Sequence, residues 1–216
     1  MIAHWDLIQG SAEWLEIKYG RVGGSTSKGL FVDSDTLIDE LISARLEPFE
    51  LPDDPYASPA MERGNEFEPM ARRALQEYTG ISFSECGWLQ SEENDLLGIS
   101  PDGLTKDLKT ACEIKCPGRK KHTQTLREGA IPLEHNFQLV HNFTVNPHLE
   151  RIYFCSFRPE CKFDMFVRYL DLNSLVNLGT KSKPSIKTVA DWAILARQKG
   201  DDLLRAVNNG IAQLEF

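Results

Sequence analysis

Acidic and basic side chains are closely spaced in the stretch SPDGLTKDLKTACEIKCP, which spans residues 100–117. Asp102 stands in an SPDG turn, and Glu113 and Lys115 follow it two residues apart. Because side chains alternate between the faces of a strand, Glu113 and Lys115 would share one face while Ile114 points into the core. A hairpin between the two segments would bring Asp102 beside Glu113.

Two converging carboxylates repel each other, and in a partly buried site they need a nearby cation. Mg²⁺ or Mn²⁺ fits this need because both ions prefer oxygen ligands, and the carbonyl of Ile114 is a further candidate ligand. Such an ion polarises a phosphodiester and activates water. Lys115 would be partly deprotonated beside it or would position the water. Spacing alone favours a hairpin exposed to water, whereas the SPDG turn and the apolar residues around Glu113 favour a metal site.

The composition predicts one soluble globular domain, because the 216 residues are 41% hydrophobic and 26% charged. We find no signal peptide and no apolar run long enough to span a bilayer, and therefore expect a cytoplasmic location. The net charge of −8 does not exclude DNA, since a metal-dependent nuclease keeps carboxylates at its centre and basic residues around them. The five cysteines lack a C-x2-C spacing, which favours reduced thiols over disulfides or zinc.

The elements that would position these residues follow from the spacing of apolar side chains. Helical spacing is found in 35–46, 61–80, 134–145 and from about 187 onward. Strands are predicted in 81–90, 95–104, 110–117, 151–159 and 163–172. The proline-rich segment 47–60 predicts a surface loop. This order predicts a single α/β domain over 1–216, with a mixed central β-sheet flanked by helices, a core over about 14–172 and a C-terminal helical region over about 185–216.

The segments SPDGL and CEIKCP together resemble the PD-(D/E)xK nuclease signature. More specifically, they resemble the phage lambda exonuclease / YqaJ-like viral recombinase family. Three further segments match that family: EWLEIKYGRVGGSTS near the N-terminus, RGNEFEPMAR around Glu68, and NFQLVHNFTV around Gln138. The resemblance covers about residues 14–157.

This resemblance implies a restriction-endonuclease-like core and a Mg²⁺-dependent 5′–3′ exonuclease. Such an enzyme digests linear double-stranded DNA from 5′-phosphorylated ends and leaves 3′ single strands for phage-type homologous recombination. By the same resemblance Asp102 and Glu113 would bind the metal, with two ions of Mg²⁺ (or Mn²⁺) per site. Glu68 would support the second ion or its water, and Lys115 would serve the nucleophile.

The resemblance also implies DNA-binding residues. Ser25 and Ser100 would lie near a pocket for the terminal 5′-phosphate. The arginine that the family uses to hold this phosphate aligns with Lys18, while Arg21 lies three residues further on, so either residue could bind it.

Two other segments are candidates for DNA contact. Gln138 matches the first glutamine of a Q-x-Q pair, but the second position is Val140. The basic residues Arg119, Lys120 and Lys121 directly follow the CEIK segment. They would either contact DNA phosphates or simply face solvent.

Partners are implied by the resemblance as well. The family forms closed rings around duplex DNA, so we expect a homotrimer that works with a single-strand annealing protein in a bacterial host. Two alternatives remain: a PD-(D/E)xK endonuclease, and an inactive nuclease-fold scaffold that binds DNA ends.

Overall fold

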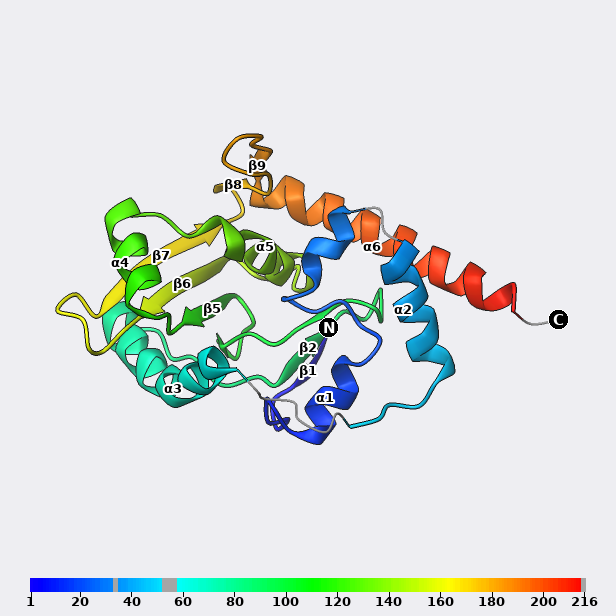
Figure 1. Cartoon of the computed structure of the whole chain (residues 1–216), viewed down its shortest axis with the longest axis horizontal. Helices are drawn as coiled ribbons and strands as arrows, with labels where there is room; N and C mark the ends of the chain where they lie inside the picture. The colour runs from blue at the N-terminus through cyan, green and yellow to red at the C-terminus, as the bar shows by residue number, and fades with distance from the viewer. Residues whose placement is uncertain (33–34, 52–57, 215–216) are drawn as a thin grey trace.

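A four-stranded mixed sheet lies at the centre of the computed structural model, which describes residues 1–32, 35–51 and 58–214 (Figure 1). Its order is β4 (Gly103–Leu104), β5 (Thr110–Lys115), β6 (Arg151–Phe157) and β7 (Met165–Asp171). β5 and β6 are parallel, and the other pairs are antiparallel. The crossover between the parallel strands contains α4 (Arg119–Glu128), η2 (Leu133–His135) and α5 (Asn136–Val145). The predicted mixed α/β class is confirmed.

A second sheet lies beside the first. It joins β1 (Ile2–His4), β2 (Trp88–Gln90) and β3 (Gly98–Ile99) in antiparallel order. The strands predicted between 81 and 115 are therefore divided between two sheets, and the chain changes sheets at the SPDG turn. A third, two-stranded sheet consists of β8 (Leu175–Asn177) and β9 (Ile186–Thr188).

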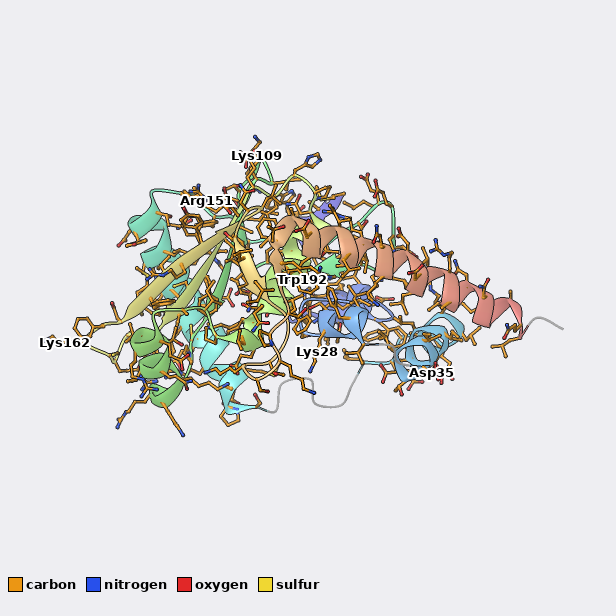
Figure 2. The ribbon with its side chains drawn as sticks, turned by 90° about the horizontal axis from the view of Figure 1, so that it is seen from above. Lys28, Asp35, Lys109, Arg151, Lys162 and Trp192 are labelled. Carbon is orange, nitrogen blue, oxygen red and sulfur yellow. The ribbon has the colours of Figure 1, made fainter. Side chains whose placement is uncertain are left out.

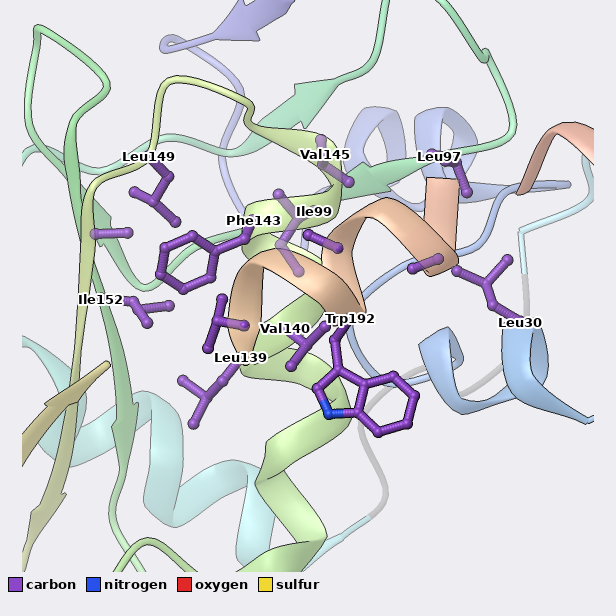
Figure 3. Packing of buried hydrophobic residues seen from close by; sticks show 14 of the residues in the cluster. Leu30, Leu97, Ile99, Leu139, Val140, Phe143, Val145, Leu149, Ile152 and Trp192 are labelled. Carbon is purple, nitrogen blue, oxygen red and sulfur yellow. The ribbon is translucent and has the colours of Figure 1, made fainter. Parts of the chain in front are cut away.

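Helices cover both faces of the central sheet. On one face Ala71 and Leu75 of α3 (Pro59–Thr79) pack against Cys112 and Ile114 of β5. The other face carries the larger apolar cluster, in which α5 packs against α6 (Val189–Ala212). Figure 3 shows the centre of this cluster, with Leu139, Val140 and Phe143 of α5 beside Trp192 of α6. Ile114 thus points into the core, as predicted.

Helix α3 begins earlier than the sequence indicates. Ser58 caps its N-terminus by accepting a hydrogen bond from the backbone N–H of Met61, and Gly80 ends it in the left-handed conformation with φ of 69°. Pro69 therefore lies inside the helix. Because proline has no N–H, the carbonyl of Asn65 lacks its usual helical donor one turn before Glu68.

The N-terminal part of the chain adds short elements around the sheets: α1 (Ala12–Lys18), η1 (Ser27–Phe31) and α2 (Asp35–Leu46). α2 was predicted, whereas β1, α1 and α4 were not. Of the predicted loop 47–60, residues 52–57 lie outside the described residues, and Pro59 and Ala60 begin α3.

Helix α6 runs along α5 and α2 and extends to one end of the molecule (Figures 1 and 2). Thr188 caps it by accepting from the backbone N–H of Asp191, and the indole of Trp192 donates to the carbonyl of Val176 at 2.9 Å. Within the described ranges, none of the helices is long and apolar enough to cross a bilayer.

Candidate active site

The predicted hairpin between the SPDG turn and the CEIK strand is present. Gly103 pairs with Cys112 across the antiparallel β4–β5 ladder, which places Asp102 beside Glu113. The Oδ2 atom of Asp102 accepts a hydrogen bond of 2.6 Å from the backbone N–H of Ile114. The backbone N–H of Ile114 therefore contacts Asp102. That the carbonyl of Ile114 binds a metal ion stays a prediction.

Glu113 is the most deeply buried acid of this region, with a relative exposure of 0%. Neither of its carboxylate oxygens accepts a hydrogen bond from the part of the protein that the structure describes, although the ammonium of Lys115 touches one of them. Burial and then the charge of Asp102 raise the pKa of Glu113 to about 8, against the opposing charge of Lys115. Among the described residues, the counter-ion of this buried carboxylate is the ammonium of Lys115.

Glu68 reaches the same place from α3. Burial and then the charge of Asp102 raise its pKa to about 7, while Arg72 acts in the opposite direction. Burial also raises the pKa of Asp102, against the charge of Lys115. Glu68, Asp102 and Glu113, here called the carboxylate centre, therefore repel one another in a poorly hydrated environment.

Arg72 is a residue of the site that the sequence analysis missed. Its Nε donates to the backbone carbonyl of Asp102 at 2.7 Å, and its other nitrogens contact the carboxylates of Glu68 and Glu85. It thereby ties α3 to the SPDG turn. The available signal was its position four residues after Glu68, a spacing at which oppositely charged side chains meet on a helix.

The residues fit a divalent cation in charge and in atom type. Buried, mutually repelling oxygen donors are stabilised by a hard cation such as Mg²⁺. In residues 1–32, 35–51 and 58–214, however, no group of three or more His, Cys, Asp or Glu side chains is already arranged around a common point. Lys115 and Arg72 balance the carboxylates instead, so binding of an ion requires these side chains to move.

Lys115 remains charged in this arrangement. Burial disfavours its ammonium, but the nearby charges of Glu113 and Asp102 outweigh this effect and raise the pKa of Lys115. Of the two predicted roles, this favours a lysine that positions a water molecule over one that is partly deprotonated.

A pocket of about 180 Å³ adjoins the carboxylate centre, and we call it the terminal pocket. The predicted residues Lys18, Ser25, Ser100 and Gln138 line it, and so does Asp102. The N-terminal segment, the SPDG turn and α5, which are distant in the sequence, therefore meet at this pocket.

The structure separates the two candidates for binding the terminal phosphate. The Nζ atom of Lys18 lies 3.6 Å from the ring centroid of Trp14 in this pocket, and burial lowers its pKa to about 8. Arg21 does not line the pocket. Its Nε donates to the carbonyl of Asp95 at 3.0 Å, and its Nη1 donates to the carbonyl of Ile17.

Trp14 also orients Ser100. Its indole N–H donates to Oγ of Ser100 at 2.8 Å and to the carbonyl of Gly87 at 2.9 Å, and Ser100 Oγ donates to the same carbonyl at 2.7 Å. The hydroxyl proton of Ser100 is thus engaged, and it must rotate before it can donate to a phosphate. Trp14 lines the pocket, although sequence analysis assigned it no separate role.

The wall of the terminal pocket depends on close approach between α5 and the N-terminal segment. A Cβ at Gly24 would lie 2.7 Å from Cδ1 of Ile99 and 3.0 Å from Cγ of Gln138, so a larger residue would force these two side chains to shift. His141, the sixth residue of α5, has its Nε2 3.1 Å from the Val22 carbonyl and 3.0 Å from that of Gly98. Because both partners are acceptors, Nε2 carries the proton.

The remaining candidates lie outside the pocket. Arg119, Lys120 and Lys121 are exposed on the first turn of α4, and Lys121 pairs with Glu134 at 2.9 Å. Val140 is fully buried in the core, so α5 brings one glutamine to the site and not two.

Comparisons with known proteins identify the family and the fold of the chain. The YqaJ-like viral recombinase domain matches residues 13–147, which is more than half of the chain. Among curated proteins no sequence matches significantly.

Similar folds occur in exonuclease structures. The alkaline exonuclease LHK-Exo from Laribacter hongkongensis superposes with a TM-score of 0.73 at 23% identity, covering 95% of this chain and 96% of that one. The structure of LHK-Exo in complex with dAMP superposes with a TM-score of 0.69 at 22% identity, covering 94% of this chain and 100% of that one. A phage-related exonuclease from Haemophilus somnus superposes with a TM-score of 0.51 at 10% identity, covering 90% of this chain and 96% of that one. At these identities the likeness concerns the fold. From the matched residues, the chain belongs to the YqaJ-like viral recombinase domain family.

Proposed function

We propose that this protein is a Mg²⁺-dependent 5′–3′ exonuclease that digests linear double-stranded DNA from 5′-phosphorylated ends, leaving 3′ single strands for homologous recombination. The observation that carries the proposal is that Asp102 belongs to the carboxylate centre and also lines the terminal pocket with Lys18, Ser25 and Ser100. An enzyme that removes terminal nucleotides must hold the end beside the bond that it cuts. An endonuclease has no such need.

The family and its structural neighbours support this proposal. The neighbours are named as exonucleases, and one was crystallised with dAMP, a deoxynucleoside monophosphate of the class that an exonuclease releases.

Lys18 is the residue proposed to bind the terminal phosphate. It forms no ion pair with another described residue, and its ammonium lies in a pocket where burial strengthens attraction to an anion. Trp14 holds the ammonium in place from one side. Ser25 and Ser100 supply hydroxyls to the phosphate oxygens.

The carboxylate centre is proposed to hold two divalent ions through Asp102, Glu113 and Glu68, with the Ile114 carbonyl as a further ligand. The ions would supply Lewis-acid polarisation of the scissile phosphate and neutralise its charge. Lys115, once released from Glu113, donates a hydrogen bond that positions the attacking water. The water oxygen bonds to phosphorus as the bond to the 3′ oxygen of the terminal nucleotide breaks. The remaining strand keeps the phosphate, so its new end is again a 5′-phosphate.

The test compares linear 5′-phosphorylated duplex with closed circular duplex, each with Mg²⁺ or with EDTA. Release of mononucleotides from the linear form alone, from the 5′-labelled end and only with Mg²⁺, is the expected result. Cutting of the circle would instead identify an endonuclease. No Mg²⁺-dependent loss of either DNA would identify a scaffold that binds DNA ends.

Assembly and partner belong to the proposal through the family. We propose a homotrimeric ring around the duplex, which works with a single-strand annealing protein. Light scattering should then give three times the 24.4 kDa of one chain, and a monomer at working concentration would contradict the ring.

A further inference from the structure

The connection between β6 and β7, residues 158–164 and here called the tip loop, lies at the catalytic edge of the sheet. β5 and β6 are parallel, so the tip loop follows β6 at the same end at which β5 delivers Lys115. Figure 1 shows this loop projecting beside α3 and α4, and Figure 2 shows Lys162 at the outer end of the molecule. Ligands of sheets with parallel strands bind outside the carboxyl ends of those strands.

The tip loop is fastened to both elements that flank the carboxylate centre. Arg158 donates to the carbonyl of Pro117, two residues beyond Lys115, at 3.3 Å. On the other side Arg63 of α3 forms two hydrogen bonds, of 2.9 and 2.8 Å, with the carboxylate of Glu160. Such a bidentate pair fixes orientation as well as distance.

A buried histidine provides a third attachment. His122 of α4 is 0% exposed, and its Nε2 donates to the backbone carbonyl of Phe163 at 2.8 Å. Its Nδ1 accepts from the hydroxyl of Ser156 at 2.9 Å, because the carbonyl partner assigns the proton to Nε2. The backbone of Phe163 is therefore held in place from beneath.

The side chain of Phe163 nevertheless points into solvent, with 66% of its surface exposed. Lys162 lies 5.8 Å from its ring, and Arg119 and Lys120 on the first turn of α4 pair with no acid among the described residues. An aromatic ring on a fixed backbone, with a cation beside it, is a combination by which proteins hold nucleic-acid strands, with bases stacked on the ring and phosphates near the charge.

We propose that Phe163 stacks against a base of the DNA substrate beside the carboxylate centre, while Lys162 and the first turn of α4 contact the flanking phosphates. The inference rests on the proposed function only in taking DNA as the substrate. It gives the tip loop a stacking contact with a DNA base, which neither the carboxylate centre nor the terminal pocket supplies.

The test places the fluorescent base 2-aminopurine at successive positions from the end, in either strand of a 5′-phosphorylated duplex. Binding is measured in EDTA, where no strand is cut. The wild-type protein should change the emission strongly at one position or two neighbouring ones. Phe163→Ala should abolish that change and weaken binding roughly tenfold, the size of one lost stacking contact. Phe163→Tyr and Phe163→Trp should retain both.

Tyr78→Ala is the matched control. Tyr78 is also 66% exposed, but it lies on α3 fifteen residues beyond Arg63, which is about 22 Å along the helix axis. Its removal should leave emission and affinity unchanged. Unfolding midpoints of all variants should match that of the wild type, because neither ring is buried.

The outcomes separate this inference from the proposed function. Equal emission profiles and affinities for wild type and Phe163→Ala would overturn the inference, even if the protein cuts linear DNA, and would leave the tip loop to an acidic protein partner. A Phe163-dependent signal without Mg²⁺-dependent cleavage would support the inference and overturn the nuclease. Absence of DNA binding by the wild type would overturn both.

Discussion

The carboxylate centre and the terminal pocket share Asp102, yet they balance charge in opposite ways. In the centre two of the three carboxylates already contact cations, since Lys115 contacts Glu113 and Arg72 contacts Glu68. In the pocket the ammonium of Lys18 lies over an aromatic ring and forms no ion pair with another described residue. The centre must therefore break ion pairs before it binds a cation, whereas the pocket is already arranged to attract an anion.

This difference has a physical consequence for the order of binding. An uncompensated cation gains free energy directly from a phosphate, while a closed set of ion pairs first loses its own contacts. We therefore expect DNA ends to bind in the absence of divalent ions, and ion binding to be strengthened by the scissile phosphate.

The largest effect is expected at Glu113. Glu113→Gln should reduce turnover by about a thousandfold or more, because it removes a ligand and a charge that the reaction needs. The same change should raise the unfolding midpoint in EDTA, because burial and the charge of Asp102 raise the pKa of Glu113 to about 8, so that ionising this carboxylate destabilises the folded state. Turnover and thermal unfolding measure the two effects.

Lys115→Ala and Lys109→Ala complete this comparison. Lys109 lies on the same hairpin but is exposed and paired with Glu150, so its removal should leave turnover unchanged. Full cleavage by Lys115→Ala would refute the role proposed for that lysine.

The second largest effect concerns the pocket. Lys18→Ala should reduce the preference for 5′-phosphorylated over 5′-hydroxyl ends by about a hundredfold, as expected for a lost charge-assisted contact in a buried site. Arg21→Ala should keep the preference, because its guanidinium is bound to two backbone carbonyls outside the pocket. The opposite ranking would move the phosphate site to Arg21.

A smaller effect should appear in stability at acid pH. Burial lowers the pKa of His141 to about 4 from 6.5, so the unfolded chain binds a proton between these values and the folded one does not. The neutral, buried His141 thus contributes its full stability above pH 6.5, and this contribution is lost as the pH falls toward 4. Its size is about 2 kcal/mol between pH 7 and pH 5.

Urea unfolding at the two pH values measures this loss. Burial lowers the pKa of His135 to about 4 as well, so it adds a loss of the same sign. His141→Gln should reduce the difference, and an unchanged difference would exclude His141 as its source.

The smallest effect is a pH dependence of end recognition. Because burial lowers the pKa of Lys18 to about 8, its ammonium loses its proton as the pH rises above that value. The preference for phosphorylated ends should then fall several-fold between pH 7.5 and pH 9.5, with bound phosphate shifting the midpoint upward. Lys18→Arg keeps its charge and should remove the dependence. A pH-independent preference in the wild type would contradict a protonated Lys18 as the anchor.

Prediction from sequence succeeded where regular structure sets the geometry. The alternation of β5 and the length of the hairpin placed Asp102, Glu113 and Lys115 together, because strand period and register leave few alternatives. Helical spacing likewise located Glu68 on α3. The deep burial of Glu113 was not predictable, because it depends on how α3 and α5 cover the two faces of the sheet.

Prediction was weaker for residues held by tertiary contacts. Lys18 and Arg21 stand three residues apart, and the hydrogen bonds of Arg21 to the carbonyls of Ile17 and the distant Asp95 decide which one faces the pocket. α4 was not predicted as a helix because its sequence, RKKHTQTLRE, has no apolar stripe. The buried contacts of α4 to Ser156 and Phe163 are made by His122. A single histidine among basic residues does not indicate such a role in the sequence.

Asp102 has one further consequence for the product. Because one side chain borders both the place where the end is held and the place where the backbone is cut, no hinge or linker separates the two. The length of each released fragment is then fixed by the fold and not by the base sequence. Under the proposed function, substitutions in either half would slow the enzyme without lengthening the fragments that it releases.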